Sequence, residues 1–187
     1  MGEKKELDLK TRAKIYQYIL KNPGLHEREL SRVLDIPLST IDYHLYFLKK
    51  RELIISKSDG HYTFYFVSGK IGIKDKTIFK VLRQKVTRNI IIFLLLKKEA
   101  THGTIKDEIA LAPSTVSFHL KKLVDLEILK VKVVGRETFY SAIEPDYISD
   151  LIITYKKSFL DDAVDRFADT WLELHPKHLK KNKKKKD

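Results

Sequence analysis

The chain has 187 residues, with 37 Lys and Arg against 25 Asp and Glu, and therefore a formal net charge of +12 at pH 7. A basic chain suggests a polyanionic partner such as nucleic acid, although a solvated lysine-rich surface gives the same total. Cysteine is absent, which excludes disulfides, Cys-ligated zinc and thiol chemistry.

The N-terminal residues are charged and lack the apolar stretch of a signal peptide. The apolar run at 90–96 is far shorter than the ~20 residues that cross a bilayer. We therefore expect no membrane partner and a cytoplasmic, nucleoid-associated location.

The first 67 residues predict three helices and two strands. Apolar residues between 9 and 20 follow a helical period, which Asn22-Pro23-Gly24 ends. A second short helix is predicted up to residue 35. Ser39 is a good N-cap for a third helix, whose inner positions are Ile41, Leu45 and Leu48. Two β-rich segments, 53–57 and 62–67, flank the turn signal Asp59-Gly60.

Residues 39–67 recur as residues 114–142, a constant 75 positions later. Of the 29 pairs, 11 are identical, whereas chance gives roughly one pair in fifteen. The chain is therefore two copies of one unit. The second copy repeats the pattern with helices at 87–98, 104–110 and 114–126 and strands at 129–134 and 137–142. We expect the first two helices of the copies to align with a one-residue slip.

Helix, helix, turn, helix and hairpin form the winged helix-turn-helix. The segment PSTVSFHLKKLVDLEIL, residues 113–129, resembles the recognition helix of ArsR- and MarR-type winged-helix regulators. The duplicated unit with a C-terminal helix resembles archaeal regulators that contain two such domains, and the resemblance covers residues 8–143. The expected class is mainly α with small β-hairpin wings (α+β). The predicted segments are a first winged helix-turn-helix (1–69), a basic linker helix (70–86), a second winged helix-turn-helix (87–144), a C-terminal amphipathic helix (145–175) and a disordered Lys-rich tail (176–187).

In this fold the third helix enters the major groove of DNA and places its N-terminal half at the base edges. The residues predicted to contact DNA lie on the outer face of each third helix and on each wing: Ser39, Thr40, Asp42, Tyr43, Tyr46, Lys50, Lys57, His61, Ser114, Thr115, Ser117, Phe118, Lys121, Lys122 and Arg136.

Several of these residues have a second interpretation. Ser39 and Ser114 cap their helices with or without a phosphate contact. Tyr43 and Phe118 either contact DNA or pack on the neighbouring wing. Arg136 suits minor-groove insertion but is also an ordinary turn residue. With Lys121, Lys122 and Arg136, the second copy is predicted to be the stronger electrostatic docking element.

His44 and His119 occupy equivalent positions next to a buried leucine. No further ligands lie at a suitable spacing, so we interpret both as partly buried histidines hydrogen-bonded to a neighbour rather than as a metal site. We expect no metal and no cofactor. Because Gly-rich phosphate loops, nucleophile elbows and paired carboxylates are also missing, we do not expect an enzyme.

Apolar residues in 146–174 recur at steps of three and four and form one stripe. Terminal helices often join two copies of such regulators, so the stripe predicts a homodimer; the alternative is that it folds back on its own chain. Another alternative is two helices broken near Ser158, which would cap the second. The predicted dimerisation residues are Ile148, Ile152, Tyr155, Phe159, Phe167 and Trp171.

These features predict a dimeric, sequence-specific transcriptional regulator that reads double-stranded DNA at an inverted-repeat operator through two winged helices per chain. The alternative is a winged-helix protein-interaction module of the basal transcription or chromosome-organisation machinery, which Asp42 on a recognition helix favours. No residue pattern marks a small-molecule effector.

Overall fold

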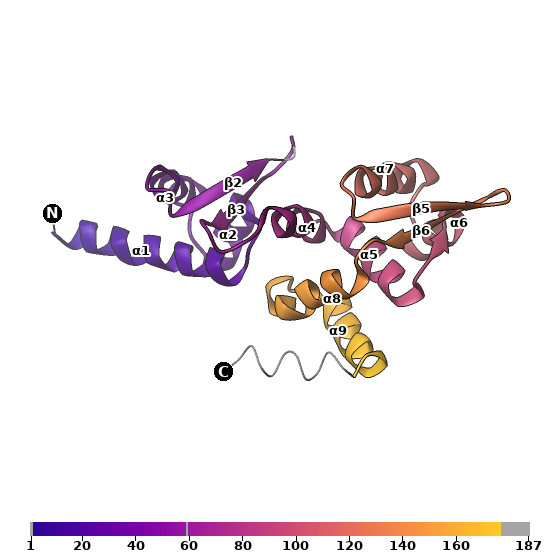
Figure 1. The fold of residues 1–187 in the computed structure, drawn as a ribbon. Coiled ribbons are helices and arrows are strands. Elements are labelled where there is room, and N and C mark those ends of the chain that lie inside the picture. The colour runs from indigo at the N-terminus through magenta and orange to yellow at the C-terminus, as the bar shows by residue number, and fades with distance from the viewer. Residues whose placement is uncertain (1, 59, 177–187) are drawn as a thin grey trace. The chain divides into compact units, whose positions relative to one another are not determined.

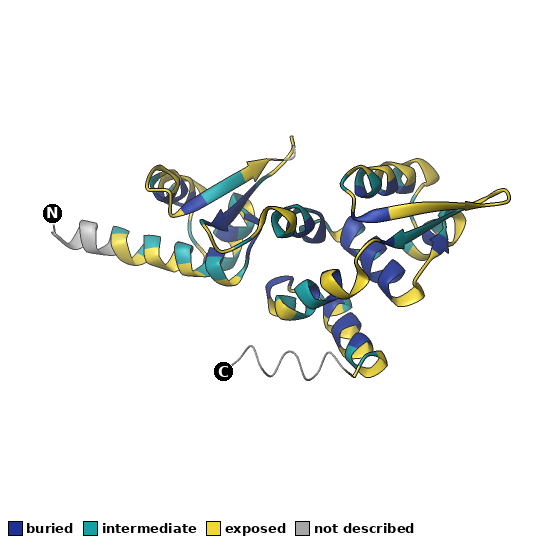
Figure 2. Ribbon diagram, in the orientation of Figure 1, coloured by how far each residue is buried: buried dark blue, intermediate teal, exposed yellow. Residues whose placement is uncertain are grey.

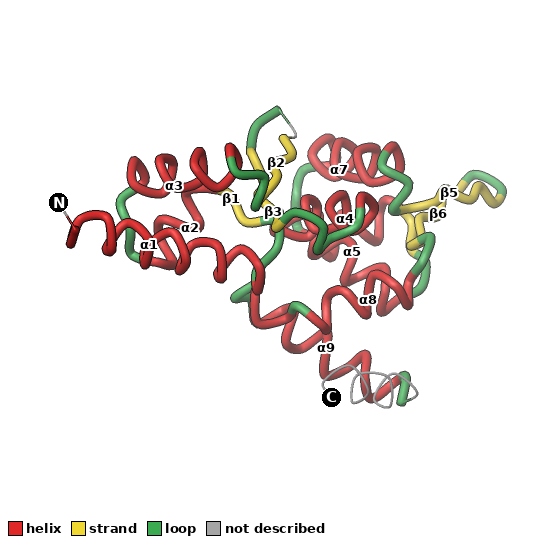
Figure 3. The backbone as a smooth tube through the Cα atoms, turned by 60° about the vertical axis from the view of Figure 1, so that its left-hand side comes forward, coloured by secondary structure: helices red, strands yellow, loops and turns green. Residues whose placement is uncertain are grey.

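The computed structural model describes residues 2–58 and 60–176, with side chains described from Asp8 onward. The chain divides into two compact units, Met1–Lys80 and Val81–Asp187, and each is described by itself. Figures 1 and 3 show the same order of helices and strands repeated in the two units. The division falls inside the segment 70–86 that was predicted as a linker helix, where the structure has a helix over Ile73–Arg83.

The first unit is a helical domain with one small antiparallel sheet, whose strand order is β1-β3-β2. Its elements are α1 (Gly2–Lys21), β1 (Leu25–His26), α2 (Glu27–Leu34), α3 (Leu38–Lys50), β2 (Ile54–Ser58), β3 (Thr63–Val67) and α4 (Ile73–Arg83), which crosses the division. The predicted inner face of the third helix is confirmed, because Ile41, Leu45 and Leu48 are all buried.

The strand β3 of the first unit is buried on both faces of the sheet. Tyr65 joins the main core, whereas Phe66 lies beside Gly24 and Phe79 of α4. A Cβ atom on Gly24 would lie 3.2 Å from the Cβ of Phe79, and the φ of Gly24 is +78°. Glycine is required at this position, both for the left-handed backbone and for the close approach of α4.

The second unit repeats this domain and then adds two helices. Its elements are α5 (Lys85–Lys97), β4 (Ala100–Thr101), α6 (His102–Ile109), α7 (Pro113–Asp125), β5 (Leu129–Val134), β6 (Glu137–Ala142), α8 (Pro145–Thr154), the 3-10 turn η1 (Lys156–Ser158) and α9 (Asp162–Leu174). Its sheet has the equivalent order β4-β6-β5.

The two units share backbone details at the same offset of 75 residues. Asp35 and Ala110 both end a helix with φ near +55°, and Glu52 and Glu127 share a positive φ after the third helix. The helices α2 and α6 start 75 residues apart, as do α3 and α7. The expected one-residue slip in the alignment of the two copies is therefore wrong for their second helices. The positive-φ residue that ends each second helix lies at the same place in both copies, and so does the start of the third helix.

The prediction that Ser39 and Ser114 cap the third helices is wrong. The helices begin at Leu38 and Pro113, with Pro37 and Ala112 as N-caps and no side-chain cap hydrogen bond. Pro113 is well placed at a first helical position because its fixed φ suits the helix and its missing N–H needs no partner. Each serine instead lies inside the first turn, exposed to solvent.

Each wing belongs to a three-stranded sheet rather than to the predicted two-stranded hairpin. The additional strands, β1 and β4, have two residues each and pair with the last strand of the wing, as in the Leu25–Tyr65 pair. A strand of two residues is too short to show the alternation by which strands are predicted.

The prediction of one C-terminal helix over 145–175 is wrong, and the alternative of two helices is confirmed. The break lies between Thr154 and Asp162. The second helix is capped by Asp161, whose side chain accepts a hydrogen bond from the N–H of Ala163 at 2.9 Å. Ser158, the predicted cap, is buried and accepts a hydrogen bond from Arg83 instead.

The predicted dimerisation stripe lies in the core of its own unit. Ile148, Ile152, Phe159, Phe167 and Trp171 are between 0% and 8% exposed, and α9 packs on both α5 and α8. Figure 2 shows α9 with its buried side towards the rest of the unit. Tyr155 is half-buried. The fold-back alternative is therefore correct, because the winged helix of the second unit has an apolar surface on α5 that α9 covers.

Candidate nucleic-acid interface

The outer face of α7 is the candidate reading surface of the second unit. Val116, Leu120 and Leu123 are buried against the domain, which leaves the opposite side of the helix free. Ser117, Phe118 and Lys121 lie on that side, and the Phe118 side chain is 64% exposed. A phenyl ring this exposed costs hydration free energy unless it meets a partner.

The wing of the second unit carries charge at its tip and along one strand. The positive φ of Gly135 makes the turn between β5 and β6, and Arg136 beside it is exposed. Lys130 and Lys132, which were not predicted as contacts, are also exposed on β5. They alternate with valines, and this alternation in a wing strand is the signal that could have identified them.

Hydrogen bonds orient some of the polar side chains of α7. His102 Nε2, at the start of α6, lies 2.9 Å from Ser117 Oγ and helps to position it. The sequence did not identify His102 as part of this surface. Lys121 forms an exposed ion pair with Asp125 at 2.7 Å. Lys122 is half-buried and donates to Gln84 Oε1 at 3.3 Å. Its ammonium group is therefore less accessible to DNA than the exposed position expected from the sequence.

The equivalent surface of the first unit has different chemistry. Asp42, Tyr43 and Tyr46 are exposed on α3, where the second unit has Ser117, Phe118 and Lys121. Burial, together with the charges of Glu27 and Asp42, raises the pKa of Tyr65 to about 12. This surface is therefore acidic and aromatic.

The remaining predicted contacts lie at the surface of one unit or the other. Ser39, Lys50, Lys57 and His61 are exposed in the first unit, as is Ser114 in the second, while Thr40 and Thr115 are half-buried at the start of their helices.

The two equivalent histidines do not form the expected hydrogen bonds. The Nδ1 atoms of His44 and His119 are buried with no hydrogen-bond partner among the described residues, and each ring lies edge-on to the preceding aromatic ring. Burial lowers the pKa of both, with the charge of Arg12 contributing at His44 and that of Lys122 at His119. Both are therefore neutral packing residues near pH 7.

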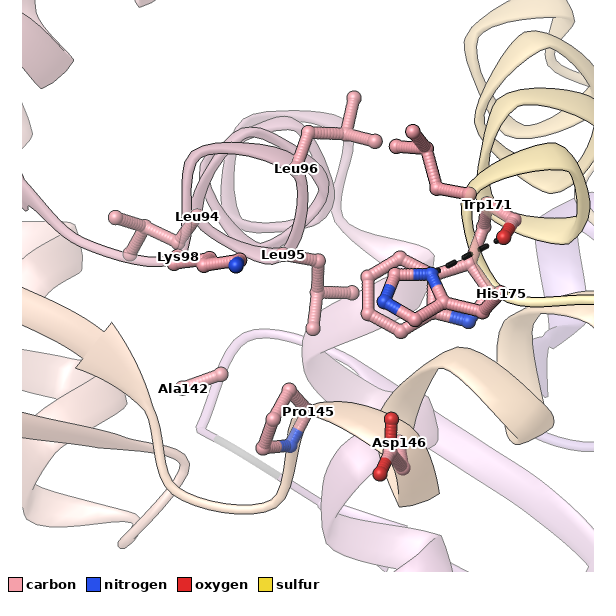
Figure 4. A pocket seen from close by; sticks show the side chains of 10 residues that line it. Leu94, Leu95, Leu96, Lys98, Ala142, Pro145, Asp146, Trp171 and His175 are labelled. Carbon is pink, nitrogen blue, oxygen red and sulfur yellow. Dashed lines mark hydrogen bonds between the residues drawn. The ribbon is translucent and has the colours of Figure 1, made fainter. Parts of the chain in front are cut away.

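A cavity of about 420 Å³ lies in the second unit, between the ends of α5 and α9 and the start of α8. Figure 4 shows Leu95 and Pro145 facing the Trp171 and His175 rings, which are stacked with centroids 4.1 Å apart. The lining is mostly apolar, and the opposite charges of Lys98 and Asp146 favour neither an anion nor a cation.

Within residues 2–58 and 60–176, no cluster of three His, Asp or Glu side chains has the arrangement of a metal site. A search of the same part of the chain for a helix able to span a membrane found none. The exposed outer faces of α3 and α7, each beside a wing, define the class of the protein. The chain is a tandem winged helix-turn-helix protein.

Sequence comparisons agree with this class. Residues 9–77 match a family described as an N-terminal HTH domain, and residues 85–131 match the bacterial regulatory protein, arsR family. An HTH-type transcriptional regulator of Methanocaldococcus jannaschii, itself uncharacterised, is 36% identical over 157 residues, which are 84% of this chain and 38% of that relative. The chain thus spans well under half the length of this relative. Both parts of the chain therefore match helix-turn-helix families, and the second part matches that of the ArsR regulators, in agreement with the resemblance seen in the sequence.

Solved structures of other proteins are similar to part of the chain. The transcriptional repressor BigR from Xylella fastidiosa is 20% identical with a TM-score of 0.39, covering 43% of this chain and 81% of the repressor. Diamide-treated YodB from B. subtilis is 16% identical with a TM-score of 0.39, covering 56% of this chain and 95% of YodB.

Proposed function

We propose that this protein is a DNA-binding transcriptional regulator whose second unit is the principal reader of duplex DNA. The observation that carries the proposal is the outer face of α7, where Ser117, Phe118 and Lys121 project beside the exposed Arg136 of the wing. In a winged helix the third helix reads base edges in the major groove, while the wing reaches the backbone or the minor groove.

Each side chain on this surface has a chemical complement on DNA. Lys121 and Arg136 would neutralise phosphates and release counterions. Phe118 offers an apolar surface to thymine methyl groups. Ser117, held by His102, is a small donor or acceptor for a base edge. These side chains can therefore supply both affinity and sequence preference.

The experiment compares two double variants by DNA-binding titration at several salt concentrations. Lys121→Ala with Arg136→Ala should weaken binding strongly and lower the salt slope by roughly one to two units, because two phosphate contacts are lost. The matched control is Lys49→Ala with Lys50→Ala, which removes the same charge from α3. A larger loss in the control would show that the second unit is not the docking element.

Sequence specificity is tested separately by selecting bound sequences from random duplex DNA at a stated salt concentration. A regulator should enrich a discrete site, whereas equal recovery of all sequences would leave only non-specific binding. The predicted inverted repeat would appear in the same selection as a two-fold symmetric site.

The homodimer remains part of the proposal but needs a surface other than the buried C-terminal stripe. A two-fold dimer would match an inverted-repeat operator. Light scattering with and without DNA measures the assembly, and a single chain on a symmetric site would contradict it. The proposed place of action is the chromosomal DNA of the cytoplasm.

A further inference from the structure

The duplication provides an internal comparison of two recognition surfaces. Four equivalent positions on the two surfaces differ in chemistry: the first unit has Glu27, Asp42, Tyr46 and Tyr62 where the second has His102, Ser117, Lys121 and Glu137. The first unit therefore has carboxylates and phenols where the second has cationic or neutral polar groups, apart from Glu137.

The members of this set lie close together. The helices α2 and α3, which carry Glu27 and Asp42, pack on each other, and both carboxylates lie within electrostatic reach of the Tyr65 phenol. Tyr43 follows Asp42, and Tyr46 lies one helical turn further along the same face. Tyr62 stacks on the ring of His26, the residue before Glu27, with the ring centroids 5.3 Å apart. We call Glu27, Asp42, Tyr43, Tyr46 and Tyr62 the aromatic–acidic surface.

No cation among the described residues pairs with the carboxylates of this surface. Neither Glu27 nor Asp42 forms an ion pair with any residue that the structure describes, and Glu27 Oε2 is buried without a hydrogen-bond partner there. A buried acceptor left unsatisfied costs free energy. The half-buried Glu27 side chain would recover it by turning this oxygen towards a donor from outside. Both features make the site complementary to a positive charge.

The exposed phenol rings add to this complementarity. Tyr43 is 55% exposed, Tyr46 67% and Tyr62 46%. Tyrosine is enriched among the residues that dominate protein interfaces, and its ring face attracts Lys and Arg cations. The phosphates of a nucleic acid, by contrast, would be repelled by Asp42 and Glu27.

We propose that the aromatic–acidic surface docks a lysine- or arginine-rich segment of a partner protein, so that the two units divide the work between protein and DNA. The proposal does not depend on the DNA-binding role of the second unit. Lys49 and Lys50 in the last turn of α3 are exposed and repel such a segment, which confines it to the N-terminal half of the helix.

The test exchanges residues between the units in the full-length protein. Asp42→Ser with Tyr46→Lys gives the first unit the residues of the second, and Ser117→Asp with Lys121→Tyr makes the reverse exchange. All four side chains are exposed, so both variants should fold, which circular dichroism checks. The probe is a fluorescent Arg/Lys-rich peptide of twelve or so residues, with an acidic peptide of equal length as the control, followed by anisotropy.

The native chain should bind the basic peptide, and the first-unit exchange should weaken this binding about tenfold or more, as expected when an interface tyrosine and its charge partner are lost. The same exchange should leave the affinity for duplex DNA unchanged or higher, while the second-unit exchange should lower it. No peptide binding by the native chain, or loss of duplex or single-stranded DNA binding in the first-unit exchange, would overturn the proposal.

Discussion

The buried pair of Arg88 and Asp161 provides a sharp stability test, because it ties the first helix of the second unit to the start of α9. The two side chains are 7% and 17% exposed, and Arg88 also donates to the Leu82 carbonyl oxygen at 2.8 Å. Replacing Asp161 with Asn keeps a capping side chain for α9 but leaves the guanidinium without its counter-charge. Breaking a buried pair costs ~3–5 kcal/mol, and partial exposure of Asp161 reduces this to about 2–4 kcal/mol.

The assay is thermal unfolding followed by the fluorescence of Trp171, the only tryptophan of the chain, which lies on α9. At ~4–8 °C per kcal/mol for a domain of this size, a loss of about 2–4 kcal/mol should lower the melting temperature of the second unit by roughly 10–30 °C. The matched control is Asp162→Asn, which alters only an exposed first-turn acid worth about 0.3–1 kcal/mol. Equal losses in the two variants would refute the role of the buried pair.

The pH dependence of this loss follows from the charge of Asp161. Burial raises its pKa, but the hydrogen bonds from Arg88 and the N–H of Ala163 and the charges of Arg88 and Lys85 outweigh burial and leave the pKa below its ordinary value. The carboxylate therefore stabilises the fold above its unfolded pKa of about 4, and this contribution disappears as the pH falls through the lower folded value. The difference in unfolding free energy between the native chain and Asp161→Asn should therefore become smaller at acidic pH.

Two further predictions concern the first unit. Because burial lowers the pKa of His44, its contribution to stability is complete above the unfolded pKa of ~6.5 and is lost at lower pH. His44→Leu should therefore flatten the decline of unfolding free energy between pH 7.5 and 5.5, and an unchanged slope would contradict this. Gly24→Ala should cost about 1–3 kcal/mol by thermal melting, since it adds a clash with Phe79 to left-handed backbone strain. The control is Gly60→Ala, because Gly60 also has a positive φ but an added Cβ atom would contact nothing within 4 Å. This variant measures the backbone strain alone and should lose less stability than Gly24→Ala.

The repeat, the winged-helix class and the inner faces of the third helices could all be predicted from the sequence. Ile41, Leu45 and Leu48 are spaced so that one side of a helix is apolar, and this local periodicity holds whatever surrounds the helix. The outward positions of Tyr46 and Lys121 follow from the same geometry. So does the contrast between the two recognition surfaces, because equivalent positions can be compared directly along the chain.

Other features depend on contacts between distant residues. The stripe through Phe167 and Trp171 indicates an apolar helix face but not what covers it, and the tertiary structure places α5 of the same unit there. The His102–Ser117 contact, and the absence of a hydrogen-bond partner for Glu27 Oε2 among the described residues, likewise depend on the tertiary structure. The physical reason is that periodicity records which side of an element avoids water, whereas the identity of its partner depends on which surfaces the folded chain brings together.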